Sequence, residues 1–412
     1  MNFIKNQKII ENFKVYDVFL SPLKPKDRNV LLSLKMMYAI HMENNELKNT
    51  FVVKQLLRFM LKLIMIPFVK ININGVKSNH TILAEGRIEK NLSQMLDISL
   101  INMKKTVTLN LDFIQVYKKL YQVVVIVNKD KTLKKRYIFS LLHRLIDYLL
   151  VYYTVDIKGI KVLLVENDRL PSNLALIHKV KEKNIKTVKY DNWLIDPINH
   201  NDIYCEYYFY PSLYHRDIIE NLSSNKNLKY IEGGFLDWDR LNNYILNPKK
   251  KIIYFTQFGI DISIHFEYIK DIINILKIQK LDYGLIVKTH PRENIQSYKA
   301  ILEIDDKIEL IDSCEDIYSL ICTANFCFSI FSTICLEAKH IINDSYFINY
   351  RVNNFDIIDY NKLDLDVITN KKMLEDVLLS TYKAIDKEKF IEKNNCTFPN
   401  TKNVMRELIA DD

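Results

Sequence analysis

Three side chains suited to phosphate and proton chemistry follow one short apolar run in the second half of the chain. Residues 285–287 are Leu-Ile-Val, and Lys288, His290, Pro291 and Arg292 come soon after. In an open α/β sheet, ligands bind where such strands end. Lys and Arg suit phosphate, His exchanges a proton near neutral pH, and Pro ends the strand pairing because it has no N–H. The pattern predicts a phosphate site, and a solvated basic loop is the alternative.

Two other predicted strand ends carry hydroxyl or amide side chains. Thr256 and Gln257 follow the apolar residues 252–255, and Ser332 and Thr333 stand between a predicted strand and a predicted helix. A hydroxyl at a helix start, beside free backbone N–H groups, can bind an anion without any glycine. Ser332 and Thr333 alone would fit an ordinary helix cap. The prediction therefore depends on all three strand ends lying on one rim of a parallel sheet.

Size and composition indicate a two-domain globular protein with an anionic partner. The chain has 412 residues, 48% of them hydrophobic and 26% charged, and a net charge of +8. Only 7 residues are glycine, so a glycine-rich phosphate loop is not expected. No nucleic-acid-binding module is recognisable, and we expect no nucleic-acid partner. The six cysteines form no CxxC pair and are expected to be free thiols, with no metal site.

The first 155 residues are harder to interpret than the rest. The apolar runs at 81–84, 107–111 and 123–127 fit strands, and residues 137–153 have the apolar spacing of a helix. Residues 56–70 contain Arg58, Lys62 and Pro67, so they are unsuited to crossing a membrane. They fit a basic amphipathic helix on a membrane surface, or a core helix with exposed basic positions. The N-terminus has no signal-peptide pattern.

From residue 161 onward, short apolar runs alternate with helical patterns. This alternation predicts parallel sheets with crossover helices, in an α/β fold. Helices are expected over residues 266–276 and from Glu293 to about Leu302. The single Gly-Gly pair, Gly233-Gly234, precedes a change of pattern. We place the domain boundary there, which predicts one domain over residues 1–235 and another over 236–412.

The second half resembles a known superfamily. The Lys-x-His-Pro at 288–291, the Ser-Thr at 332–333 and the Thr-Gln at 256–257 are similar to motifs of bacterial GT-B glycosyltransferases, above all sialyltransferases and capsule polysialyltransferases. Polymerases that transfer glycerol or ribitol phosphate from CDP donors share the layout. The resemblance covers about residues 230–350. It implies two Rossmann-like domains facing across a cleft, the first binding the acceptor and the second the nucleotide-sugar.

The resemblance also implies roles for individual residues. His290 would act as general acid, or as electrostatic stabiliser of the departing nucleotide, and Lys288 would support the phosphate charge. Ser332 and Thr333 would hold the phosphate at the helix start. The remaining residues expected to contact the donor are Pro291, Arg292, Thr256, Gln257, Asp312 and Glu315.

The base that deprotonates the acceptor is less clear. The acidic-acidic-Gly motif of the sialyltransferases does not occur in this chain, which leaves the sialyl donor open. We predict Glu166, Asp168 or Asp191, each at the end of a first-domain strand, as the base, with His200 as another candidate. A solvated or capping carboxylate is the alternative for each.

These expectations describe an inverting glycosyltransferase of the bacterial cytoplasm. It would move a sugar, such as sialic acid from CMP-sialic acid, to a glycan of the capsule or lipopolysaccharide, and would need neither metal nor cofactor. Residues 56–70 would provide peripheral contact with the inner membrane. Two alternatives stay open: a polyol-phosphate transferase using CDP-glycerol or CDP-ribitol, and a non-catalytic GT-B scaffold that binds glycan or membrane.

Overall fold

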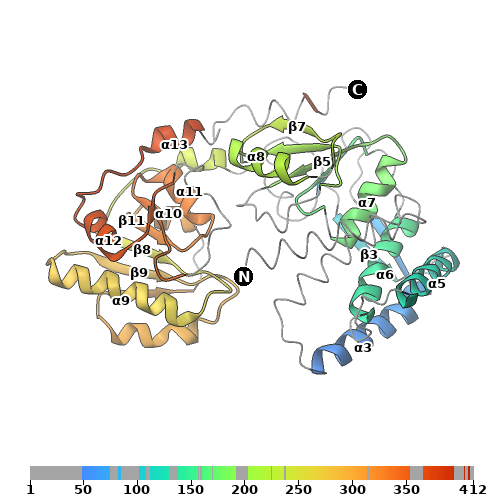
Figure 1. Ribbon diagram of the computed structural model, residues 1–412, viewed down its shortest axis with the longest axis horizontal. Coiled ribbons are helices and arrows are strands. Elements are labelled where there is room, and N and C mark those ends of the chain that lie inside the picture. Colours follow the sequence, from blue (N-terminus) through green and yellow to red (C-terminus); the bar gives the residue numbers. More distant parts are fainter. Residues whose placement is uncertain are drawn as a thin grey trace.

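The fold is α/β, with one parallel sheet in each half of the chain. The computed structural model describes residues 49–74, 82–84, 102–107, 112–129, 138–155, 157, 160–168, 170–191, 203–223, 225–235, 238–312, 316–352, 365–393, 403, 407 and 408. Figure 1 shows the two sheets in separate parts of the molecule, each with helices packed against it. The sequence prediction of an α/β class with two parallel sheets, the core of the GT-B expectation, is confirmed.

The first sheet has five parallel strands in the order β2-β4-β5-β6-β7. They are β2 (Ile82–Ala84), β4 (Val162–Val165), β5 (Lys186–Tyr190), β6 (Tyr207–Tyr210) and β7 (Lys229–Glu232). Strand β4 is a continuous buried run, as expected of a parallel strand covered on both faces. The crossover helices are α7 (Pro171–Lys181) and α8 (Leu213–Leu222). Pro171 suits the first turn of α7, where its missing N–H would have no partner.

Three helices and a small antiparallel pair lie beside this sheet. The helices are α3 (Asn49–Met65), α5 (Phe113–Lys129) and α6 (Ile138–Thr154), and the strands are β1 (Val69–Asn74) and β3 (Asn102–Val107). The 3₁₀ turn η1 (Ile66–Phe68) connects α3 to β1. The expected helix at 137–153 is therefore present as α6, and the run at 81–84 does form a strand. The strand prediction for residues 123–127 was wrong, because they belong to α5. Of the run at 107–111, only residue 107 is in a strand, and residues 108–111 lie outside the described ones.

The second sheet has six parallel strands in the order β10-β9-β8-β11-β12-β13. They are β8 (Lys251–Phe255), β9 (Gly284–Lys288), β10 (Ile308–Ile311), β11 (Ala324–Ser329), β12 (Ser345–Ile348) and β13 (Val367–Ile368). The chain adds β9 and β10 on one side of β8 and then crosses to add β11 on the other. This reversal beside β8 is a topological switch point, the place where open α/β sheets bind ligands.

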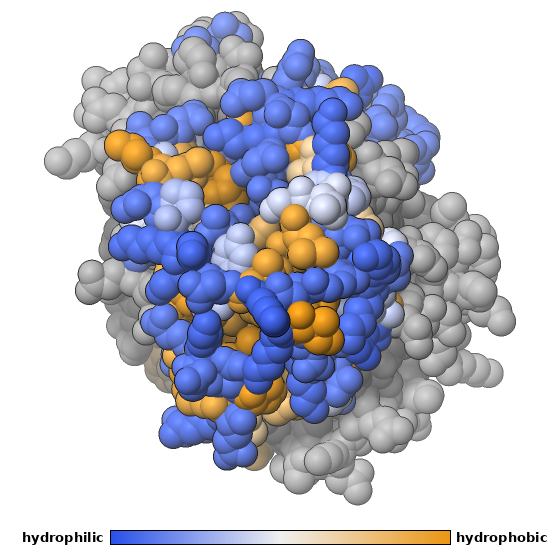
Figure 2. All heavy atoms as spheres, turned by 90° about the vertical axis from the view of Figure 1, so that its left-hand side faces the viewer, coloured by the Kyte–Doolittle hydropathy of each residue, from blue (hydrophilic) through white to orange (hydrophobic). Residues whose placement is uncertain are grey.

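Helices cover both faces of the second sheet (Figure 1). They are α9 (Ile262–Ile278), η4 (Ile295–Glu303), α10 (Ile317–Ile321), α11 (Ile334–Ile341), α12 (Lys371–Leu378) and α13 (Lys387–Lys393). The helix expected over 266–276 is confirmed as part of α9, and the helix expected after Glu293 is the 3₁₀ helix η4. The outer end of this domain is mainly hydrophilic, with hydrophobic residues in separate groups (Figure 2). None of the described helices is both long and apolar enough to cross a bilayer.

An aromatic stack joins the two halves. The 3₁₀ helix η3 (Trp238–Asn243) follows β7, and the rings of Phe235 and Trp238 stack with centroids 3.9 Å apart. Phe235 also contacts His215 of α8, while Trp238 packs edge-on against His340 of α11. The side chains between β7 and β8 are therefore part of one core that continues from the first sheet to one face of the second. The predicted boundary at residue 235 falls in this segment.

The glycine pair before this junction has a steric cause. A Cβ atom placed on Gly233 would lie 1.7 Å from the ring of buried Phe209, and Gly234 has φ +73°, which favours glycine. We expect Gly233→Ala to lower the free energy of unfolding by about 1–3 kcal/mol, because the core must shift to admit a methyl group. The measurement is chemical denaturation. In the control Gly284→Ala, the nearest atom lies 3.8 Å from the new Cβ, and equal losses in the two variants would contradict the explanation.

His340 makes the stability of the junction depend on pH. Burial lowers the pKa of His340 to about 4, and its Nε2 lies 2.8 Å from Asn242 Oδ1. The unfolded chain binds a proton at this residue below its ordinary pKa of about 6.5, whereas the folded chain does not until pH approaches 4. Stability is therefore fully present above pH 6.5 and is lost as the pH falls toward 4, by up to about 3 kcal/mol.

We expect His340→Gln, which has no titrating ring, to lose less stability than the unmodified protein between pH 7 and pH 4.5. Denaturant unfolding at a series of pH values measures this difference, and the other acid-sensitive groups are common to both proteins. Parallel stability curves for the two proteins would show that His340 contributes nothing to the acid sensitivity.

Candidate active site

The loops after β8 and β9 and the segment between β11 and α11 form one group, which we call the strand-end site. In the sheet, Phe255 pairs with Lys288 on one side and with Ser329 on the other. Thr256, Thr289 and Ile330 therefore follow at the same edge. The strands β9 and β11 are two spacings apart, about 10 Å, with β8 between them. This arrangement puts the His290 loop and the start of α11 at the same edge of the sheet, one on each side of β8.

His290 has a defined ring orientation within its loop. Its Nδ1 accepts a hydrogen bond from the backbone N–H of Arg292 at 3.1 Å, so the neutral ring carries its hydrogen on Nε2. The exposed ring of Phe258 stacks on the imidazole with centroids 5.9 Å apart. The guanidinium of exposed Arg292 lies over the Phe258 ring, 5.9 Å from its centroid. The loop therefore presents a hydrogen-bond donor beside an exposed cation.

A carboxylate that sequence reasoning missed ties this loop to its neighbour. Glu293 Oε2 accepts from the backbone N–H of His290 at 3.1 Å and from the hydroxyl of Thr256, while Oε1 accepts from Tyr298 at 2.8 Å. The backbone N–H of His290 also donates to Thr256 Oγ1 at 2.9 Å. Burial, and then the Glu293 carboxylate, raise the pKa of the Tyr298 hydroxyl. These bonds hold the loops after β8 and β9 in one arrangement.

A local signal could have identified Glu293. It stands three residues after His290, and the two residues exchange bonds, since the Glu293 N–H donates to the His290 carbonyl at 2.9 Å. This is the spacing of a capping box, in which a Glu three positions on accepts the first backbone N–H. Thr256, expected to contact the donor, is instead 2% exposed and bonded within this cluster.

Lys288 supports the loop from beneath. Its side chain is almost completely buried, and Nζ donates to the carbonyls of Thr289 at 2.7 Å and Asp312 at 2.8 Å. The Asp312 carboxylate accepts from the Thr289 hydroxyl at 3.3 Å, and Asp312 is exposed. The ammonium thus places positive charge at the end of β9 while it fixes two strand ends together. Pro291 is exposed, and Glu315 lies outside the described residues.

The start of α11 differs from the expected side-chain cap. Thr333 has helical backbone angles and makes no side-chain cap bond, because the tight turn from β11 is closed by Ser329, whose hydroxyl accepts from the Ser332 N–H at 2.8 Å. Ser332 and Thr333 are both half-buried. The positive end of the α11 dipole remains, and it favours an anion.

Gln257 is an oriented acceptor at the same edge. Its backbone N–H and carbonyl both lie 3.3 Å from Nε2 of His265, a buried residue of α9 whose pKa is lowered by that burial. The side-chain Oε1 of Gln257 is buried and has no hydrogen-bond partner among the described residues.

The predicted bases of the first domain are engaged in internal bonds. Asp191 and Asp168 are each 1% exposed. Asp191 accepts from Lys189 Nζ at 2.8 Å and from the Tyr208 hydroxyl at 2.7 Å, and Asp168 accepts from the Tyr204 N–H at 2.7 Å. These bonds give Asp168 and Asp191 a role in stabilising the fold, which matches the capping alternative for each. Glu166 is 9% exposed and remains a predicted base, and His200 lies outside the described residues.

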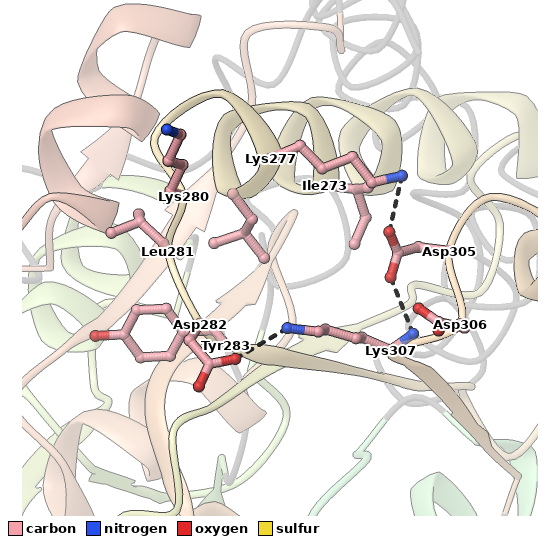
Figure 3. A pocket seen from close by; sticks show the side chains of 10 residues that line it. Ile273, Lys277, Lys280, Leu281, Asp282, Tyr283, Asp305, Asp306 and Lys307 are labelled. Atoms are coloured by element: carbon pink, nitrogen blue, oxygen red, sulfur yellow. Dashed lines mark hydrogen bonds and ion pairs between the residues drawn. The ribbon is translucent and has the colours of Figure 1, made fainter.

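A cavity elsewhere in the second domain is separate from this site. It encloses about 330 Å³ between the end of α9 and the beginnings of β9 and β10, at the opposite edge of the sheet (Figure 3). Its lining has three lysines and three aspartates, Lys277 Nζ lies 2.8 Å from Asp305, and Lys307 Nζ lies 2.9 Å from Asp282. The lining therefore has no net positive charge for a phosphate. Among the described residues, no group of three acidic, His or Cys side chains could hold a metal ion.

Comparison with known proteins gives only distant similarity. No protein-family model and no curated protein matches the chain. Solved structures that resemble it include the wall teichoic acid polymerase TagF, at 13% identity and TM-score 0.44, covering 89% of this chain and 98% of that one. UDP-GlcNAc 2-epimerase from Methanocaldococcus jannaschii reaches 14% and 0.49, covering 81% and 99%. A glycosyltransferase from Rickettsia africae reaches 12% and 0.44, covering 81% and 97%. At these values the similarities assign neither family nor activity.

The Glu293 cluster predicts energetic coupling between the two loops. We expect Thr256→Val and Glu293→Gln to destabilise the protein non-additively, with a coupling of about 0.5–3 kcal/mol, because both remove the same shared hydrogen bonds. A double-mutant cycle in denaturant measures this coupling. In a control cycle of Glu293→Gln with Lys307→Gln, at the opposite edge of the sheet, the effects should add within about 0.5 kcal/mol. Additive effects in the first cycle would show that the loops are not coupled through Glu293.

Proposed function

We propose that the chain is an inverting glycosyltransferase that moves a sugar from a nucleotide donor to a cell-surface glycan. The observation that carries this proposal is the strand-end site at the switch point beside β8. There His290, with its hydrogen on Nε2, follows β9, and helix α11, whose N-cap residue Thr333 makes no side-chain cap bond, follows β11. Such a combination suits the phosphate of a leaving nucleotide.

The second domain would stabilise the leaving group. As the bond between the anomeric carbon and the donor phosphate oxygen breaks, negative charge grows on that oxygen. His290 Nε2–H would donate to it, and the first turn of α11 with the hydroxyls of Ser332 and Thr333 would hold the phosphate from the other side. The charges of Arg292 and Lys288 add to the same field. Fixed donors of this kind usually contribute the largest catalytic effect, because they need no reorganisation during the reaction.

The first domain would supply the acceptor and its base. The acceptor hydroxyl oxygen attacks the anomeric carbon on the face opposite the leaving phosphate, and its proton passes to a carboxylate. Glu166, which follows β4, is our candidate for this carboxylate. A sialic acid carried by CMP is one donor that fits the proposal, and a capsule or lipopolysaccharide glycan is the corresponding acceptor. The setting would be the bacterial cytoplasm, next to the inner membrane.

Transfer of a polyol phosphate from CDP-glycerol or CDP-ribitol is the second candidate function. The lack of the acidic-acidic-Gly motif of the sialyltransferases favours it, and Asp168 and Asp191 accept hydrogen bonds within the fold. Here the acceptor hydroxyl attacks phosphorus, and CMP departs. Mass spectrometry of the acceptor distinguishes the two reactions, since only the second adds phosphorus to the product.

Replacement of His290 tests both candidate functions. We expect His290→Ala to reduce nucleotide release from the active donor by about 10²–10⁴-fold, because the leaving phosphate loses its proton or hydrogen-bond donor. The assay would screen CMP, CDP and UDP conjugates, first by thermal shift, where a ligand at 100 times its Kd adds about 2.7 kcal/mol of stability. The control Lys307→Gln lies at the opposite edge of the sheet and should leave turnover unchanged.

Two outcomes would overturn the assignment. Full turnover by His290→Ala, with its melting temperature unchanged, would remove the catalytic role of His290. Nucleotide or glycan binding without turnover of any donor would instead support the non-catalytic scaffold.

A further inference from the structure

One face of α3 exposes hydrophobic side chains that the core does not use. The exposed residues recur at helical spacing: Leu57 is 58% exposed, Met60 48%, Leu61 64% and Ile64 62%. Successive residues of an α-helix are about 100° apart, so these four lie within one stripe. Phe68, 49% exposed in η1, follows one turn later. Scattered single hydrophobic residues are normal on a protein surface, but a continuous stripe marks an interaction site.

The opposite face of α3 holds the helix firmly against α6. Phe59 is buried, as is Ile66 of η1, and the ring of Phe59 lies 5.8 Å from that of Phe139. The ammonium of Lys62 forms an ion pair with Asp147. The exposed stripe is therefore presented by a helix whose other side is already packed.

Helix α5 meets α3 near the end of α3 and has exposed hydrophobic residues of its own. The Tyr117 hydroxyl donates to the carbonyl of Leu63 at 2.6 Å, which joins α5 to α3. Ile114 is 63% exposed and Tyr121 is 70% exposed. Together with exposed Lys118 between them, they lie on one side of α5, since Lys118 and Tyr121 are four and seven residues after Ile114. Tyrosine suits the boundary between lipid and water because its ring is apolar and its hydroxyl polar.

The charges on these two helices have one sign. Helices α3 and α5 each contain three basic residues and no acidic residue. Arg58 stands at the border of the α3 stripe and is exposed, as is Lys118 on α5. A second copy of this chain docked on the same face would bring like charges together. An anionic surface, in contrast, would be attracted by the charges and would bury the apolar stripe.

We propose that the face formed by α3 and α5, which we call the α3/α5 face, docks on an anionic lipid bilayer and lies in the plane of the interface. The combination of an apolar stripe with basic residues and no acidic ones is that of interfacial helices. Figure 1 places both helices at the outer end of the first domain, away from the second sheet. The face shown in Figure 2, at the other end of the molecule, is mainly hydrophilic. The proposal does not depend on the function assigned above.

Vesicle co-sedimentation of the full chain tests this proposal. We expect binding to vesicles of phosphatidylcholine with phosphatidylglycerol, weaker binding to phosphatidylcholine alone, and a loss of binding as salt increases. The triple variant Leu57→Gln, Leu61→Gln, Ile64→Gln should bind at least about tenfold more weakly, because the apolar stripe is removed. Its melting temperature should stay unchanged, since all three side chains are exposed.

Matched variants separate the contributions to binding. Ile245→Gln, Ile278→Gln and Leu302→Gln together replace three exposed hydrophobic residues of the other half, and this control should bind as the unmodified chain does. Arg58→Gln and Lys118→Gln should each weaken binding to the anionic vesicles about fivefold and change binding to the neutral vesicles little.

Three results would overturn the proposal. The first is no binding of the unmodified chain to anionic vesicles, and the second is equal binding by the triple stripe variant. The third is a dimer in solution that the stripe variant dissociates without any vesicle binding, which would assign the face to a second copy. If the triple variant proves unstable, Leu61→Gln alone and the salt dependence of the unmodified chain decide the question.

Discussion

The parallel pairing of β8 with both β9 and β11 is the constraint on which the second domain depends. Strand β8 is buried and is paired on both sides, so the residues that follow it lie at the edge of the sheet between two neighbouring strand ends. The same pairing brings Lys288 and Ser329 level with Phe255, although these residues are far apart in the sequence. The crossing from β10 to β11 makes the end of β8 the topological switch point of the sheet. The strand-end site follows from this topology before any side-chain chemistry is considered.

Polar groups at buried strand ends need partners, and the two domains satisfy them differently. In the first domain, Lys189 and Tyr208 bond to Asp191, so the charge is matched within the fold. In the second domain, Glu293 accepts the backbone N–H of His290 and the hydroxyl of Thr256, which leaves the His290 ring directed by its own loop. Asp191 and Glu293 therefore both stabilise the ends of their strands. In the second domain, the bonds to Glu293 also hold the loop that carries His290, a residue capable of proton transfer.

The two ends of the molecule present different surfaces. The first domain ends in the α3/α5 face, which is apolar and basic, whereas the outer surface of the second domain is mainly hydrophilic. An enzyme that extends a surface glycan needs access to an acceptor held at a membrane and to a donor dissolved in water. The proposed membrane face and the proposed donor site lie in different domains, and this separation would allow both to be occupied together.

The amino-acid sequence by itself determined the α/β class and the strand ends of the second half, because each depends on local hydrophobic period and on nearby Pro or Gly. It misassigned residues 123–127, whose β-branched run suggested a strand, because contacts with the neighbouring helices outweigh intrinsic preference. The local pattern also suggested that Thr256 would contact a ligand, and it left Glu293 unnoticed. Only the tertiary structure decided that β8 lies between β9 and β11, that Glu293 joins the loops after β8 and β9, and that Asp191 forms an ion pair with Lys189. These outcomes depend on contacts between distant segments, and their geometry exists only once the sheet has formed.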